Sequence, residues 1–467
     1  MTLELRSPEL RSPASSLPAS SLPASSPPRS SSSSPLLTLS LAFLSSLVFF
    51  TPAATAQAKS SKGSATHAKY MGVASCASSN CHGSVAPRNA SNILQNEYST
   101  WTKHDAHAKA WLSLTTEDSK KIGAHLGITN PEQEPLCLKC HATYVKDARL
   151  QDDKFRVEDG VGCESCHGAA EHYLASHTEQ GATHKGNLKN GMTDLVAADI
   201  RTSFCLSCHL GNDDKTVDHR LIGAGHPRLT FELDTFTAIE PAHWDVDDDY
   251  RERKEAYVPA KAWLVGQLGR SQELISAMTS KQRSRSGEGL MAGPELTLLY
   301  CYTCHHSLTE EQWKNRSYNG KPGELRLNVS SLIVVQQALE ALDHSSGKRF
   351  GEEVARLHEG KELKAAATAL NVLISDASKK YSALSYDRGA TMKLLNRLVE
   401  YGSITQHLPF EVAEQLAMGI SSLSASLSSD GNQHKREVDQ IYSALATPAA
   451  FQPELFTTAC SNLLQKL

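Results

Sequence analysis

The pattern of hydrophobic and polar positions changes along the chain, and the changes divide it into parts. From about residue 325 onward, apolar residues recur with the period of an α-helix, as in "SSLIVVQQALEALDH" and "FEVAEQLAMGISSLSASL". These patterns predict an antiparallel helical bundle over 325–467. Between 59 and 310 strand patterns are scarce, and the helical stretches are short, with the clearest at 107–126 and 260–281. The predicted fold class is mainly α, a loop-rich region followed by a C-terminal α-helical bundle.

The first 58 residues have a different pattern. Residues 1–35 are a repetitive Ser/Pro-rich segment that we expect to be disordered. An uncharged apolar run, 36–50, follows, with small residues at Ala56 and Ala58. This order is typical of a signal peptide and its cleavage site. The alternative is a short membrane anchor, but the run is shorter than the roughly 20 residues that span a bilayer. We therefore predict an exported protein, located in the periplasm or an equivalent compartment. An uncleaved signal would associate it with the membrane.

The composition is unusual in its cysteine and histidine content. The 467 residues carry a net charge of −4, and the isoelectric point near 6.6 gives no indication of a nucleic-acid partner. There are 11 cysteines and 20 histidines. Ten cysteines form five close pairs, and the remaining one, Cys460, falls in a helical pattern and is predicted to be a buried, small apolar residue.

Four of the cysteine pairs have the same form, Cys-x-x-Cys-His. They are "CLKCH" (137–141), "CESCH" (163–167), "CLSCH" (205–209) and "CYTCH" (301–305). With this composition the pattern is expected roughly 0.01 times by chance in a chain of this length. A disulfide framework or a Cys₄ zinc site would not require a histidine directly after each pair. The pattern is that of a c-type haem attachment site.

The chemistry of haem attachment explains the spacing. Each thiol adds to one porphyrin vinyl group, and the adjacent histidine ligates the iron from below the ring. The cysteines predicted to hold haem are Cys76, Cys81, Cys137, Cys140, Cys163, Cys166, Cys205, Cys208, Cys301 and Cys304. The predicted proximal iron ligands are His82, His141, His167, His209 and His305. The expected cofactor is therefore haem c, in about five covalently bound copies. Because aromatic residues are only 6% of the chain, we expect the porphyrins to supply much of the apolar bulk of this region.

The first site, "SCASSNCHG" (75–83), departs from the pattern because four residues separate Cys76 from Cys81. The adjacency of Cys81 and His82 is kept, which fixes one thioether and the iron ligand. The small, turn-forming spacer can bulge outward and return Cys76 to the second vinyl group. We predict a fifth haem in a stretched site, with a single thioether through Cys81 as the alternative.

Several other histidines lie close enough in sequence to the cysteine pairs to be distal ligands. The candidates are His104, His107, His172, His177, His219 and His226. His306 directly follows a proximal ligand and cannot easily serve the same iron. The four histidines of the helical part, His344, His358, His407 and His434, are predicted to be surface residues.

Residues 70–245 resemble the tetrahaem cytochrome c-554 family, whose type member accepts electrons from hydroxylamine oxidoreductase in nitrifying bacteria. The resemblance lies in the order of the sites and in "HDAHAKAW", "GVGCESCHG" and "CLSCHLG…DHRLIGAGHP". It implies that His177 completes the haem of His82 and that His107 completes the haem of His209. It also implies that His219 or His226 completes the haem of His167. The second haem of the family has no distal protein ligand, so the haem of His141 is the expected open iron. The stretch from 142 to 166 contains no histidine, in agreement with this expectation.

Four parts are predicted: a leader and signal (1–58), a c-554-like tetrahaem domain (59–250), a helix with the fifth site (251–324) and a helical domain (325–467). We expect an exported multihaem cytochrome that carries electrons between redox partner proteins. The alternative is a multihaem oxidoreductase that acts on a small nitrogen or sulfur compound at an open haem iron. A third, weaker interpretation is a scaffold that binds a protein partner through its C-terminal helices.

Overall fold

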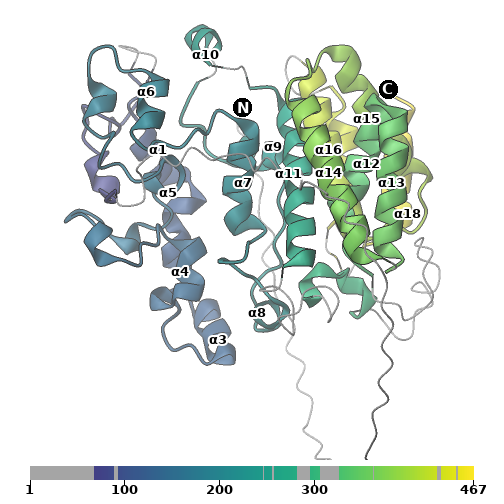
Figure 1. Ribbon diagram of the computed structural model, residues 1–467, viewed down its shortest axis with the longest axis horizontal. Helices are drawn as coiled ribbons and strands as arrows, with labels where there is room; N and C mark the ends of the chain where they lie inside the picture. The colour runs from purple at the N-terminus through teal and green to yellow at the C-terminus, as the bar shows by residue number, and fades with distance from the viewer. Residues whose placement is uncertain are drawn as a thin grey trace, which may run out of the picture. The chain divides into compact units, whose positions relative to one another are not determined.

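The chain folds almost entirely into helices and irregular loops (Figure 1). The computed structural model describes residues 68–88, 93–245, 247–254, 257–280, 295–305, 326–360, 362–428, 433–446, 448 and 451–467. The predicted leader and signal at 1–58, and His306, lie outside these residues. Within them, β-structure is limited to two isolated bridges, Tyr70 with Gln151 and Leu299 with Leu327. The predicted mainly α fold is confirmed.

The region that contains the first four cysteine pairs is built of short helices. They are α1 (Glu97–His104), α2 (Ala110–Ser113), α3 (Glu117–Leu126), α4 (Pro135–His141), α5 (Cys163–His167), α6 (His184–Lys189), α7 (Ala198–His209), α8 (His219–Gly223), α9 (Leu233–Ile239) and α10 (Asp248–Arg253). Between them lie single 3₁₀ turns and long irregular connections. The predicted helix at 107–126 is therefore interrupted: it consists of a 3₁₀ turn, α2 and α3, with a break at 114–116.

Three helices end on the histidine of a Cys-x-x-Cys-His motif: α4 at His141, α5 at His167 and α7 at His209. In each case the motif forms the last helical turn, so its side chains project from one end of a helix. The chain can turn sharply after α5 because Gly168 has a φ of 83°. A Cβ atom at Gly168 would lie 2.8 Å from the carbonyl oxygen of Gly191, which explains why glycine follows this histidine.

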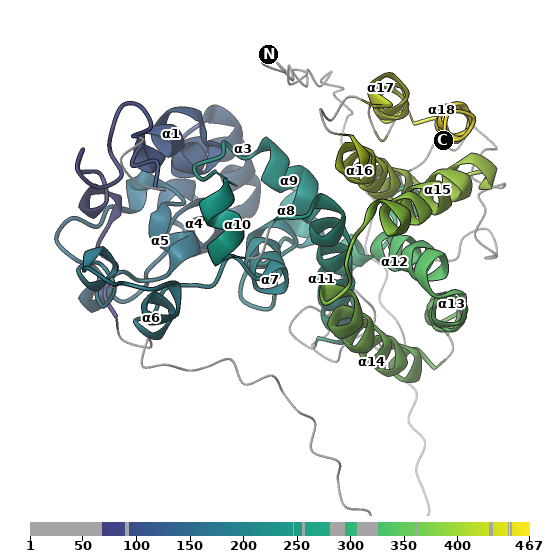
Figure 2. The same cartoon turned by 90° about the horizontal axis from the view of Figure 1, so that it is seen from above.

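The C-terminal part is a bundle of longer helices, as predicted. It comprises α11 (Pro259–Thr279), α12 (Ser330–Leu342), α13 (His344–His358), α14 (Leu363–Ser382), α15 (Arg388–Ile404), α16 (Phe410–Leu427), α17 (Lys435–Ser443) and α18 (Pro453–Leu464). Helix α12 packs against α13 and α15, and α15 packs against α16 and α18 (Figure 2). The predicted helix at 260–281 corresponds to α11.

The apolar core is distributed unevenly between the two regions. One large cluster of buried residues joins α11 to the helices that follow it, with Trp263 and Phe350 fully buried. Cys460 also lies in this cluster with no exposed surface, so its predicted burial is confirmed. The two other clusters among the described residues are small: one consists of Leu114, Leu138 and Ala142, and the other joins Leu206, Phe231 and Leu233 to Ala262 of α11. The cysteine-rich region therefore has little core of its own side chains, as expected if bound porphyrins supply the apolar bulk.

Helix α11 is shared by both regions. It packs against α7 and α9, and also against α12, α14 and α16 of the bundle. The sequence prediction grouped this helix with the fifth site in a separate part, 251–324, whereas its buried side chains belong to the cluster of the bundle. The chain divides into two units, 1–60 and 61–467, and the finer domain boundaries stay a prediction. No helix among the described residues is both long and apolar enough to cross a membrane.

Candidate haem centres

Each of four of the five predicted proximal histidines lies near a second histidine that is distant in sequence. The ring centroids of His82 and His177 are 6.3 Å apart, and those of His107 and His209 are 6.1 Å apart. The centroids of His141 and His226 are separated by 6.4 Å, and those of His219 and His305 by 6.0 Å. Each of these four pairs joins one histidine of a cysteine motif to one histidine outside any motif.

The common spacing of about 6 Å between the ring centroids has a simple chemical meaning. A metal–imidazole bond is about 2 Å long, and the ring centre lies about 1 Å beyond the ligating nitrogen. Two imidazoles that ligate one iron from opposite sides therefore have centroids about 6 Å apart. The residues of all four pairs thus fit six-coordinate haem iron.

The ring nitrogens are also oriented for this role. The Nδ1–H groups of His177 and His226 donate to the backbone oxygens of Tyr173 and Pro227, at 2.9 and 2.7 Å. The Nδ1–H of His141 donates to the carbonyl oxygen of Ala110 at 3.0 Å. A histidine whose Nδ1 is a hydrogen-bond donor is fixed in the tautomer that leaves Nε2 free to bind a metal.

Two other histidines use carboxylates for the same purpose. The Nδ1 of His82 lies 2.9 Å from Glu97 Oε2, and the Nδ1 of His107 lies 3.0 Å from Asp105 Oδ1. The hydrogen bonds to these carboxylates raise the pKa of both histidines above the ordinary value. Asp105, His107 and Glu240 also form the group of side chains most closely arranged for a separate metal ion in the described part of the chain. Because this group shares His107, it is part of the candidate haem centre.

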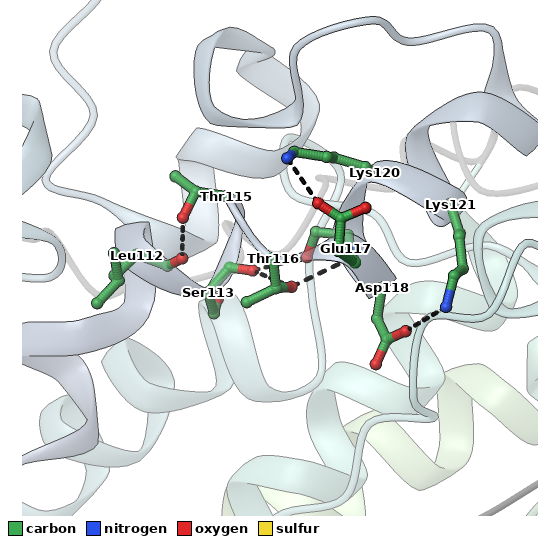
Figure 3. Close-up of polar contacts among 9 residues, drawn as sticks. Leu112, Ser113, Thr115, Thr116, Glu117, Asp118, Lys120 and Lys121 are labelled. Atoms are coloured by element: carbon green, nitrogen blue, oxygen red, sulfur yellow. Dashed lines mark hydrogen bonds and ion pairs between the residues drawn. The ribbon is translucent and has the colours of Figure 1, made fainter.

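A tight turn between α2 and α3 positions a hydroxyl group beside His141. Thr116 caps α3 by accepting a hydrogen bond from the backbone N–H of Ser119, and its own hydroxyl donates to the carbonyl of Ser113 (Figure 3). Ser113 Oγ lies 3.1 Å from the Nδ1 of His141. The turn therefore links the end of α2 to the histidine at the end of α4.

The observed pairs agree in part with those that the family resemblance implies. His177 faces His82 and His107 faces His209, as expected. The expected partner of His167 was His219 or His226, but these two face His305 and His141 instead. His141, the ligand of the expected open iron, thus has a histidine opposite it.

The remaining proximal histidine, His167, has a neighbour that the sequence analysis did not select. Burial lowers the pKa of His167 to about 4, and the charge of His243 is the next largest cause. His243 lies in "PAHW", directly before the acidic stretch "DVDDDY". Its position between Pro241 and Trp244, shortly after the fourth site, was the only sequence signal available.

Neither of the two remaining distal candidates, His104 and His172, belongs to any of the four histidine pairs, and neither does His125. His104 is exposed at the end of α1, because the backbone of Asp105 is extended (φ −85°, ψ 131°) and separates it from His107. His172 is also exposed. His125 donates from Nδ1 to the carbonyl oxygen of Ala224 at 3.1 Å. Of the four bundle histidines predicted to be on the surface, His344 is exposed and His358, His407 and His434 are partly buried.

Cysteines of different motifs lie next to one another. The thiols of Cys76 and Cys163 lie close enough for Cys163 to lower the pKa of Cys76, and Cys208 in the same way raises the pKa of Cys140. Cys166 lies close enough to Cys205 for the charge of one thiol to act on the other. None of the eleven cysteines, all within the described residues, forms a disulfide. The first site therefore adjoins the third, the third adjoins the fourth, and the fourth adjoins the second.

The stretched first site closes on itself through backbone hydrogen bonds. The N–H of Cys81 and the N–H of Gly83 donate to the carbonyl oxygen of Ser78, at 2.8 and 2.9 Å. The N–H of His82 donates to the carbonyl of Cys76 at 3.2 Å. The four-residue spacer thus forms a compact turn, and Cys76 remains next to His82.

The fifth site lies against the helical bundle. Cys301 begins a 3₁₀ turn (Cys301–Thr303), and its backbone N–H donates to Glu411 Oε1 of α16 at 3.4 Å. Cys301, Cys304 and His305 are exposed. His219, which faces His305, starts α8, and its N–H donates to Glu295 Oε1 at 2.8 Å.

The cysteine motifs and the histidine pairs define this molecule as a c-type cytochrome, the class that binds haem covalently. Comparison with known proteins shows which family part of the chain resembles. Residues 75–168 match the family model described as cytochrome c554 and c-prime. A curated relative, cytochrome c-554 of Nitrosomonas europaea, is 29% identical over 136 residues, which cover 26% of this chain and 56% of that protein. The chain is therefore cytochrome c-554-like in this region and spans about half the length of that relative. No solved structure matches the chain significantly.

Proposed function

We propose that this protein is an electron carrier that conducts electrons through about five covalently bound haems. The observation that carries the proposal is the set of four histidine pairs with ring centroids 6.0–6.4 Å apart. An iron held between two histidines has no vacant position for a substrate, which suits electron transfer rather than catalysis. When bound, haem supplies a one-electron couple, and the protein sets its potential through ligands, burial and nearby charge.

The proposed ligands follow from these pairs. His82 and His177, His209 and His107, His141 and His226, and His305 and His219 each hold one iron. For the remaining iron, that of the third site, we propose His167 with His243, because His243 is the histidine whose charge acts most strongly on His167. The cysteines of each motif attach the corresponding porphyrin.

The order of the haems along the conduction path is part of the proposal. Neighbouring cysteines support the sequence first, third, fourth and second. The fifth haem adjoins the second, because the short segment from His219 to His226 supplies the distal ligand of each. The N-terminus of α8 carries His219, and the loop directly after α8 carries His226. The fifth site would then extend the path toward the helical bundle.

The alternative function, reduction or oxidation of a small nitrogen or sulfur compound at an open iron, is less well supported. It was based on a vacant position at the haem of His141, and the ring of His226 lies opposite that histidine. We therefore propose redox proteins as the partners. Export to the periplasm is also proposed, from the signal-like segment at 36–50 and the similarity to cytochrome c-554.

The haem count tests this proposal directly. We expect the exported protein, expressed with a haem-attachment system, to carry five haems per chain in the pyridine haemochrome assay. Intact mass spectrometry should show five haem additions, and reduction should give the sharp bands of low-spin haem. A chain that carries no covalent haem would contradict the proposal. A mass increase of four haems would mean that one of the five predicted sites binds no haem. The variants described next would show whether that site is the first.

The first site gives a second prediction. Replacing Cys81 by alanine is expected to reduce the haem content more than replacing Cys76, because Cys81 is adjacent to the iron ligand His82. Haem content by pyridine haemochrome is the measurement, and Cys460→Ala serves as a control because this cysteine belongs to the bundle core. Equal losses for Cys76 and Cys81 would indicate a site with two equivalent thioethers. No loss for either variant would contradict haem binding at 76–82.

A further inference from the structure

The candidate haem ligands differ from one another in the group that accepts the hydrogen bond of their Nδ1 nitrogen. Glu97 holds His82 and Asp105 holds His107, each through a carboxylate oxygen. For the pair at the second haem, His141 and His226, both partners are neutral backbone oxygens, with the Ser113 hydroxyl as an additional neighbour of His141. A carboxylate therefore acts on one histidine of the first haem and one of the fourth, whereas both histidines of the second haem bond to neutral oxygens; His177, the partner of His82, also bonds to a backbone oxygen.

We propose that Glu97 and Asp105 are positioning residues that lower the reduction potentials of the first and fourth haems relative to that of the second. A carboxylate that accepts the Nδ1–H of a metal-bound histidine makes the ring a stronger electron donor through Nε2. Stronger donation favours the oxidised state of the iron that the histidine holds, and the negative charge acts in the same direction. A backbone carbonyl accepts the same hydrogen bond with a weaker effect, because it is uncharged. The proposal rests on the proposed function, since it requires haem at these sites.

Hydrogen bonds to the backbone hold both carboxylates in place independently of haem. Glu97 is the first residue of α1, and its second oxygen, Oε1, accepts the backbone N–H of Gln95 at 3.1 Å. Asp105 Oδ1 also accepts the backbone N–H of His107 at 2.9 Å, so one carboxylate fixes both the backbone and the ring of the ligand. The side chain of Asp105 is 6% exposed and that of Glu97 is 17% exposed. Because a buried charge is less screened by water, we expect the larger effect from Asp105.

The experiment compares E97Q and D105N with wild type in the full-length, haem-loaded protein. Each substitution keeps an oxygen that can accept the Nδ1–H and removes the charge. Spectroelectrochemical titration should show one transition moved to higher potential in each variant, with a larger shift for D105N, while the other transitions move little. The low-spin EPR spectrum should change in one component per variant, because the donor strength of one ligand has changed. These two readouts do not depend on electron transfer to a partner.

Two control variants separate this effect from a general change in charge or packing. E117Q removes the same charge from a carboxylate on α3 that pairs with Lys120 and contacts no candidate ligand in its hydrogen bonds (Figure 3). S113A removes the neutral hydroxyl next to His141. Shifts in E97Q and D105N no larger than in E117Q, at an unchanged haem content, would overturn the inference and leave the proposed function intact. Failure of the proposed function would be seen separately, as absence of haem in the wild-type protein.

Discussion

Replacing His226 by alanine is expected to convert one low-spin haem into a high-spin haem that binds nitric oxide. In the structure the ring of His226 lies 6.4 Å from that of His141, the spacing of two ligands on one iron. The variant leaves the backbone loop after α8 in place and removes one ligand, so the iron of the second haem becomes accessible. EPR of the oxidised protein should show a new high-spin signal, and added nitric oxide should give a nitrosyl spectrum from one haem per chain.

Wild type and His172→Ala provide the matched controls for this experiment. His172 is an exposed histidine near another motif, and in the structure it faces no proximal ligand. Both proteins are expected to contain only low-spin haem and to give no nitrosyl signal. A high-spin, nitric oxide-binding haem already present in wild type, and lost on replacement of His141, would contradict ligation by His226. It would instead support the family pattern and the catalytic alternative.

Replacing Trp263 by alanine should lower the free energy of unfolding by about 3–5 kcal/mol, the usual cost of removing a large aromatic side chain from a core. Trp263 has no exposed surface and lies on α11, the helix that packs against both α7 and the bundle. The side chain is in close packing with α16, because a Cβ atom at Gly419 would lie 2.6 Å from Trp263 Nε1. Such a site cannot collapse easily around a cavity.

The measurement is denaturant-induced unfolding of the haem-loaded protein, followed both by far-ultraviolet circular dichroism and by haem absorbance. Val372→Ala is the control, because Val372 lies on α14 and is 55% exposed, and it should change the unfolding free energy by less than about 0.5 kcal/mol. Since α11 also contacts α7, which ends on His209, the haem signal is expected to follow the helical signal. If both variants had the same free energy of unfolding, the buried side chain of Trp263 on α11 would contribute no more to stability than the exposed side chain of Val372.

Sequence patterns predicted the parts of this structure that depend on local chemistry. The helical period over 325–467 predicted the bundle because the burial of one face of a helix requires that spacing. The Cys-x-x-Cys-His motifs identified the residues that would attach haem, since both thiols and the ligand must come from one turn of backbone. The sequence also allowed the stretched first site to be predicted. In the structure, backbone hydrogen bonds between Cys76 and Gly83 fold the four-residue spacer into a turn.

The pairing between histidines that are distant in the chain was harder to predict from the sequence. The resemblance to cytochrome c-554 indicated that His177 faces His82 and that His107 faces His209, although about a hundred residues separate the members of each pair. It gave different partners for His219 and His226, because it contains no fifth site. In this chain His219 lies opposite His305 of the additional motif at 301–305, and His226 lies opposite His141.

The sequence by itself indicated the class of protein and the helical character of both regions and predicted the attachment residues, because each follows from spacing within a few residues. Only the tertiary structure decided which histidine faces which, and that carboxylates hold His82 and His107 while carbonyl groups hold His141 and His226. It also decided that α11 joins the bundle. These features depend on contacts between segments far apart in the chain. Packing and hydrogen bonding across the whole fold determine such contacts, and a local sequence pattern does not specify them.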